Sequence, residues 1–196
     1  MPAKTPGTRE ARGVITAASV TLAAVLVLAA LLLRRLTHRH DPLFSAEHLA
    51  LRLIIGAAIG SALAILNAVL VARLPAFERV RRLAHHAVEG IEPRWHTMLI
   101  VALAAGVGEE FFFRGALDPL VGPWFTALGF VIVHGAIKIR DRNGLMFATF
   151  LYAASVGLSA LNAWQGLEAA MAAHACYDLV MLLWLVHGAA LSRRDH

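Results

Sequence analysis

The stretch Glu109-Glu110-Phe111-Phe112-Phe113-Arg114-Gly115 sets two carboxylates and a guanidinium inside an otherwise apolar segment. An ionisable side chain near the middle of a bilayer costs roughly 2.5 to 3.5 kcal/mol on insertion scales, so three together require partners, water or a function. At about 100° per residue on a helix, Arg114 lies on nearly the same face as Glu110, whereas Glu109 points away from that pair. The pattern therefore predicts an ion pair between Glu110 and Arg114, and it leaves Glu109 as the carboxylate without a partner in its own helix.

The composition is that of an integral membrane protein. Of the 196 residues, 59% are hydrophobic, and the mean hydropathy of +0.66 is too high for an ordinary soluble domain. The net charge of +5 comes from Arg residues at the ends of apolar runs, which favours anionic lipid headgroups over nucleic acid as partners. The single cysteine, Cys176, excludes an intramolecular disulfide and a cysteine-rich metal knuckle.

Apolar runs long enough to cross a bilayer recur along the chain and predict an all-α, polytopic membrane bundle of about six helices. We expect one integral membrane domain over residues 1–196. Its candidate spans are residues 14–36, 50–73, 95–117, 123–138, 145–163 and 167–192. The first run is long enough to span and no convincing cleavage site follows it, so we expect a retained helix rather than a signal peptide. Gly56 and Gly60 give the second run a face of small residues that is typical of a helix-packing seam.

Three polar side chains are predicted to lie at one depth in the bilayer. At about 1.5 Å per residue, Glu109 is about 12 Å from the end of its span, and His134 is about 16 Å from the start of the next. These two ends lie on the same side. The last span also begins there, and His174 lies about 10 to 12 Å into it. We therefore expect a conical polar cavity between the third, fourth and sixth spans.

His134 and His174 differ in how strongly the sequence supports a functional role for each. A lone histidine in an apolar helix, such as His134, is usually a packing residue that bonds a backbone carbonyl, but the shared depth favours a functional one. His174 has Asp178 one turn further along the same face, whereas Cys176 points away from it. This arrangement disfavours chemistry with a cysteine nucleophile.

These residues resemble the three motifs of the CPBP family, which groups CAAX prenyl endopeptidases with bacteriocin-processing proteins. The stretch from Glu109 to Gly115 is similar to its EExxxR motif in the EExxFRG form. Phe130 to His134 resembles its FxxxH motif, and His174 to Asp178 its HxxxN/D motif. Each motif alone is weak, but all three in this order on separate spans are specific. The resemblance covers about residues 95–185, is to the bacterial branch, and leaves the first two spans unassigned.

The resemblance implies a glutamic-type intramembrane endopeptidase that hydrolyses a peptide bond with activated water, without a covalent acyl-enzyme. Carried over onto this chain, Glu109 and His134 would activate the water. Glu110 and Arg114 would support the site by pairing with each other.

The resemblance also implies an oxyanion site made by His174 and Asp178. The prenyl endopeptidases carry asparagine at the second position, whereas many bacterial members carry aspartate. Because a carboxylate beside a developing oxyanion is unfavourable, we expect Asp178 to act by orienting His174.

The expected partners are a membrane protein or membrane peptide as substrate and the lipid bilayer, with no nucleic acid and no cofactor or metal. Abundant Ala and Arg suggest the bacterial cytoplasmic membrane. Two alternatives stay open. In a zinc-dependent membrane protease, His134, His174 and Glu109 would hold the metal and a water, although no His-Glu-x-x-His run supports this. In a non-enzymatic carrier or binding subunit the same groups would relay protons, although a short chain without inverted halves counts against a carrier.

Overall fold

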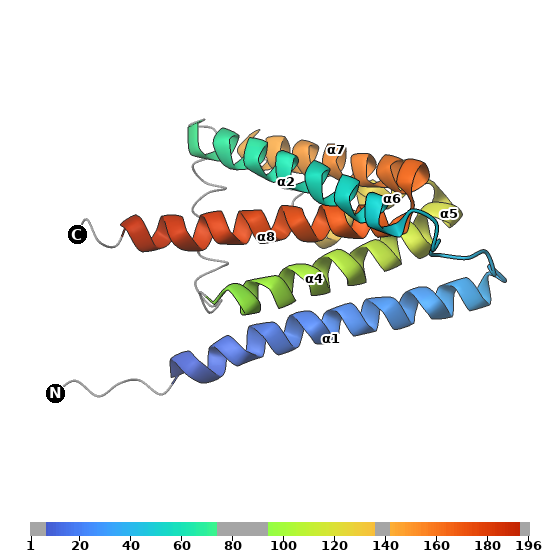
Figure 1. Cartoon of the computed structure of the whole chain (residues 1–196), viewed down its shortest axis with the longest axis horizontal. Coiled ribbons are helices and arrows are strands. Elements are labelled where there is room, and N and C mark those ends of the chain that lie inside the picture. The colour runs from blue at the N-terminus through green and yellow to red at the C-terminus, as the bar shows by residue number, and fades with distance from the viewer. Residues whose placement is uncertain (1–6, 74–93, 136–141, 193–196) are drawn as a thin grey trace.

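A computed structural model describes residues 7–73, 94–135 and 142–192, and these ranges are built from helices (Figure 1). In chain order the elements are α1 (Gly7–Leu36), α2 (Leu49–Arg73), α4 (Trp95–Phe112), the π-helical turn η2 (Phe113–Leu117), α5 (Asp118–Val121), α6 (Pro123–Val133), α7 (Arg142–Gln165) and α8 (Leu167–Ser192). Five segments within the described ranges are long and apolar enough to cross a membrane. The fold is therefore an all-α membrane bundle, as the sequence predicted.

Helix α8 is the central element of the bundle. It packs against α2, α4 and α7, and α4 packs in turn against α1. Figure 1 shows α8 between α4 on one side and the pair α2 and α7 on the other, with α1 along the outer side of α4. Because many side chains of α1 and α2 are large, apolar and exposed, their outer faces suit contact with lipid.

Small residues bring α2 and α8 into backbone contact. A Cβ atom added at Gly56 would overlap the carbonyl oxygen of Ala169, and one added at Gly60 would overlap that of Ala173. The packing seam predicted for Gly56 and Gly60 is therefore confirmed, since any larger side chain would force the helices apart. The contact at Gly60 lies next to His174, which directly follows Ala173 in the chain.

Helix α6 is shorter than the span expected over residues 123–138. It ends at Val133, because His134 leaves the helical conformation with φ of −78° and ψ of 1°. Gly135 then adopts a φ of 62°, in the left-handed region that favours glycine at the end of a helix. A helix of 11 residues is about 16 Å long, about half the hydrocarbon thickness of a bilayer. The fourth span is thus only a part-way helix among the described residues, with His134 at its end, and residues 136–138 lie outside them.

The helix that carries the two carboxylates changes its winding directly after them. The N–H of Asp118 donates to the carbonyl of Phe113, five residues earlier, which is the pattern of a π-helix. Such turns are rare and are found frequently at functional sites. Arg114 lies inside this turn, so its direction depends on the local winding as well as on its spacing from Glu110.

Candidate active site

The predicted site residues come together where α4, α6 and α8 approach one another. Glu109 and Glu110 lie in the last turn of α4, His134 directly follows α6, and His174 and Asp178 lie on α8. Glu109 contacts His134 after α6, and Glu110 contacts His174 of α8, so α4 is linked to both. Side chains about 65 residues apart in the sequence are thereby placed in one polar cluster within an apolar bundle.

Glu109 faces His134. The Oε2 atom of Glu109 lies 3.5 Å from Nε2 of His134, and the two side chains are 15% and 35% exposed. The other ring nitrogen of His134 donates to the carbonyl of Phe130 at 2.8 Å, since a carbonyl oxygen can only accept. The imidazole also stacks on the Phe130 ring, with 4.1 Å between the ring centroids. These contacts fix the orientation of the imidazole and leave Nε2 directed at the carboxylate.

Glu110 and Arg114 form the ion pair that their spacing predicts. Nη1 of Arg114 donates to Oε1 of Glu110 at 2.9 Å, and both side chains are fully buried. Nη2 of Arg114 donates to Ser155 on α7, both to its carbonyl oxygen at 2.8 Å and to its hydroxyl at 2.7 Å. A buried charge is tolerated only when it is paired and hydrogen-bonded, so this network stabilises the guanidinium. It also links α7 to the turn that carries Arg114.

His174 lies between two carboxylates. Its Nδ1 donates to Oε1 of Glu110 at 2.7 Å, and its Nε2 lies 3.6 Å from Oδ2 of Asp178. The i,i+4 spacing of His174 and Asp178 predicted that these two side chains are neighbours. It did not predict the bond to Glu110, because that bond joins α8 to α4 and no periodicity within one helix reports it.

Two further residues of the site had no predicted role. Phe130 lies between the two histidines, since its ring also stands edge-on to that of His174 and lies 5.2 Å from the guanidinium carbon of Arg114. Its place in the FxxxH motif was a signal for it. Ser155 of α7 binds the guanidinium, and a serine in a mostly apolar span offered no signal for this role.

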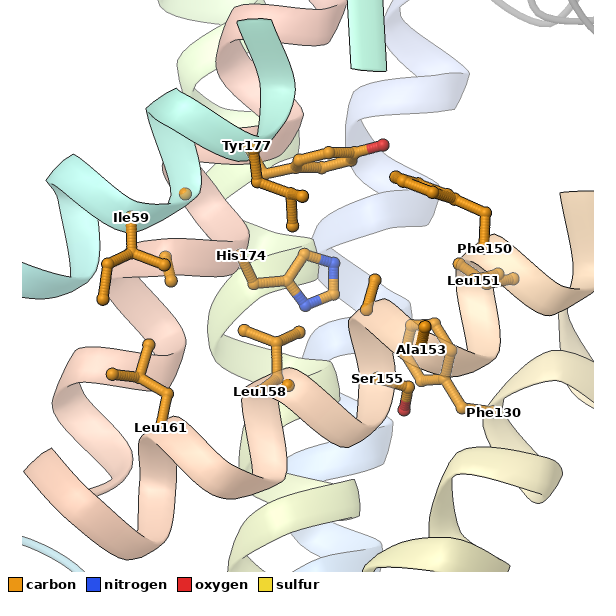
Figure 2. A pocket seen from close by; sticks show the side chains of 15 residues that line it. Ile59, Phe130, Phe150, Leu151, Ala153, Ser155, Leu158, Leu161, His174 and Tyr177 are labelled. Atoms are coloured by element: carbon orange, nitrogen blue, oxygen red, sulfur yellow. The ribbon is translucent and has the colours of Figure 1, made fainter. Parts of the chain in front are cut away.

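A cavity of about 340 Å³ opens beside the cluster (Figure 2). Figure 2 shows His174 pointing into it from α8, with Tyr177 on one side and Leu158 and Leu161 of α7 on the other. Side chains of α2 and α6 complete the lining, which is almost wholly apolar. The polar groups expected between the third, fourth and sixth spans are therefore present as contacting pairs, while this cavity lies among α2, α6, α7 and α8.

A second, smaller cavity reaches Glu109 from the opposite side. It has a volume of about 90 Å³ and is lined by residues of α1 and α4, including Ser19, Ala105 and Glu109. The buried Oε2 atom of Glu109 makes no hydrogen bond to any described residue. One carboxylate oxygen of Glu109 thus retains acceptor capacity, and the residue also lines this cavity.

In residues 7–73, 94–135 and 142–192, no three His, Cys, Asp or Glu side chains gather in an arrangement that could bind a metal ion. In the zinc site considered above, His174 could bind the metal only through Nε2, because Glu110 takes its Nδ1, and the Asp178 carboxylate lies 3.6 Å from that Nε2. The described geometry suits acid–base chemistry better than it suits a His2Glu zinc site.

The fold and the cluster together define a polytopic membrane protein with a cluster of carboxylates and imidazoles where three helices meet. Residues 91–180 match the family model described as type II CAAX prenyl endopeptidase Rce1-like. This segment, which contains all three motifs, is similar to the Rce1-like family of membrane CAAX-type endopeptidases. No curated protein and no solved structure gives a significant match to the chain. Helices α1 and α2 lie outside the matched segment.

Proposed function

We propose that the protein is a glutamic-type intramembrane endopeptidase in which Glu109 and His134 activate a water molecule. The carboxylate of Glu109 takes a proton from the water. At the same time the water oxygen bonds to the carbonyl carbon of the substrate. The carbon–nitrogen bond of the resulting tetrahedral intermediate then breaks, and the departing amine receives the proton that Glu109 took from the water, which restores the carboxylate. No acyl-enzyme forms, so no serine or cysteine nucleophile is required.

The observation that carries this proposal is the contact between Glu109 and His134. Their facing atoms lie 3.5 Å apart, and the carboxylate oxygen makes no hydrogen bond to the described residues. A water beside this pair could donate to the carboxylate while the imidazole holds its orientation. The bond from His134 to the Phe130 carbonyl keeps the ring in place during the reaction.

The oxyanion would form on the side of His174. Because Nδ1 of His174 is bonded to Glu110, only the Nε2–H group can donate to a substrate oxygen. Asp178 lies 3.6 Å from Nε2 and would favour the protonated ring that supplies this donor. In this arrangement Glu110 and Asp178 orient and charge His174, while the imidazole itself contacts the substrate.

The substrate is proposed to be a membrane-embedded protein or peptide in the bacterial cytoplasmic membrane. The cavity beside His174 is almost wholly apolar, so the part of the substrate that occupies it should be apolar as well. A peptide bond next to an apolar segment could then lie across the polar cluster. A cavity of about 340 Å³ is large enough for an apolar side chain or a short hydrocarbon chain of the substrate.

The test is a cleavage assay in a bilayer. The purified protein is reconstituted in proteoliposomes with a candidate membrane peptide, and the products are identified by mass spectrometry. Cleavage at a defined bond by the wild type, and none by Glu109→Gln at equal folded amounts, is the expected result. Equal cleavage by both forms would show that Glu109 is not the base.

A further inference from the structure

The carbonyl of Gly115 lacks the donor that an ordinary helix would provide. In an α-helix this carbonyl would accept from the N–H of the residue four positions later, which here is Pro119. Proline has no N–H, and Pro119 stands in the first turn of α5. Gly115 is buried, so its carbonyl requires a hydrogen-bond partner.

Arg34 of α1 supplies that donor. Its Nη1 atom donates to the Gly115 carbonyl at 2.9 Å, across 81 positions of the sequence. Its Nη2 atom donates to the backbone carbonyl of Asp41 and lies 3.4 Å from a carboxylate oxygen of the same residue. Arg34 is itself only 6% exposed. Burial of an arginine side chain costs desolvation free energy unless its N–H groups are hydrogen-bonded and its charge is paired, as they are here.

Asp41 keeps the guanidinium in this direction. Desolvation acts to raise the pKa of the Asp41 carboxyl, but its own backbone N–H and the charges of Arg34 and Arg39 outweigh this effect and hold the pKa below its ordinary value. Asp41 is therefore ionised at neutral pH. The planar guanidinium of Arg34 is held in one orientation, because the ionised Asp41 lies on one side of it and the Gly115 carbonyl on the other.

The segment that joins α1 to α2 packs onto the same turn. Leu43 belongs to the apolar cluster around Phe111 and lies close to Gly115, and the ring of Phe44 stands 5.8 Å from that of Phe111. The backbone N–H of Ser45 donates to Glu168 at the start of α8 at 2.6 Å. These contacts hold Arg34 and its partner Asp41 against η2 from outside the matched family segment.

We propose that Arg34 is a positioning residue that holds the turn η2 and, through it, the guanidinium of Arg114. Arg114 directly precedes Gly115, so movement of the Gly115 peptide would move the group that pairs with Glu110. Glu110 in turn orients His174. The link from Arg34 to catalysis rests on the proposed peptidase function, whereas its hold on the turn does not.

The first measurement compares Arg34→Gln with Arg35→Gln in the full-length protein in lipid nanodiscs. Arg35 is the matched control, because it is the next residue of the same helix, has the same charge and is exposed. Arg34→Gln should lower kcat on the order of tenfold with little change in KM, since displaced reacting groups slow the chemical step. It should also speed amide hydrogen exchange in residues 113–117. Arg34→Lys keeps the charge without the fork and should fall between the two.

The second measurement adds back the missing donor. Pro119 is exposed, and Pro119→Ala gives residue 119 an N–H that can bond the Gly115 carbonyl. In the Arg34→Gln background this change should restore most of the lost kcat and slow the exchange again. A charge effect of Arg34 on lipid or on solubility would not be repaired in this way.

Each result decides the proposal. Equal kcat and equal exchange in Arg34→Gln and Arg35→Gln would overturn it, as would a failure of Pro119→Ala to restore either quantity. If Arg34→Gln does not fold, recovery of folded protein in the double variant supports the proposal, and continued misfolding overturns it. Should the wild type cleave no membrane peptide, the exchange data still decide whether Arg34 holds the turn, while the peptidase function alone fails.

Discussion

His174 donates from Nδ1 to Oε1 of Glu110 at 2.7 Å, which joins the last membrane helix to the helix that carries the paired carboxylates. The same oxygen accepts from Arg114 at 2.9 Å. Glu110 therefore connects a histidine, an arginine and, through Arg114, Ser155 of α7 in one buried network. Four of the predictions below concern this cluster and the carboxylates around it.

Glu110→Gln should lower both the folded yield and the activity. The change leaves Arg114 buried without its charge partner, and removal of one member of a buried ion pair costs about 3 to 5 kcal/mol of unfolding free energy. Thermal unfolding monitored by fluorescence-detected size exclusion measures the loss. A variant as stable as the wild type would show that the network contributes little to folding.

Glu109→Gln should abolish proteolysis while the protein stays folded in the membrane. The amide keeps the shape of the side chain but cannot take a proton from water. Folding is retained because Glu109 has no ion-pair partner in its own helix that the change would leave unpaired. The comparison with Glu110→Gln is the control, because the two residues are adjacent and carry the same charge. Residual turnover near the wild-type rate would remove Glu109 from the mechanism.

Strong chelators should leave the turnover rate unchanged. Water activation is assigned to Glu109 and His134, and Glu110 and Asp178 face the two ring nitrogens of His174. The assay compares the turnover rate before and after treatment with a chelator, followed by dialysis to remove the chelator and any metal that it has bound. Activity that is lost on chelation and restored by stoichiometric zinc would place the zinc-dependent alternative first.

Asp178→Asn should retain part of the activity, and Asp178→Ala should retain less. The asparagine keeps the shape and polarity beside Nε2 of His174 but not the negative charge, whereas alanine leaves the imidazole without a neighbour on that side. The measurement is kcat in proteoliposomes for both variants. Wild-type rates in both would mean that Asp178 is only a packing or solubilising residue.

Gly60→Ala should destabilise the bundle and disturb the site. The added methyl group would overlap the carbonyl oxygen of Ala173 and push α2 from α8 next to His174, at a cost of about 1 to 3 kcal/mol. Gly129→Ala is the matched control, because a Cβ atom there meets nothing within 4 Å. Equal unfolding temperatures for the two variants would contradict the close approach of these helices.

Features set by local periodicity could be predicted from the sequence. The five long apolar helices follow from runs of apolar residues, and the pair of Glu110 and Arg114 follows from a spacing of one helical turn. The seam at Gly56 and Gly60 was likewise readable from the small residues one turn apart. The length of α6 was not predicted, although Gly135 is a residue that commonly ends a helix.

Contacts between helices were decided only by the tertiary structure. The bond from His174 to Glu110 and the bond from Arg34 to Gly115 each join residues more than 60 positions apart. No pattern within one helix encodes which face meets which neighbour, because that depends on where backbones can approach. The sequence by itself determined a membrane bundle with ionisable groups at one depth, since burial and periodicity are local properties. The packing of α8 against α2 and α4 then decided which of those groups contact one another.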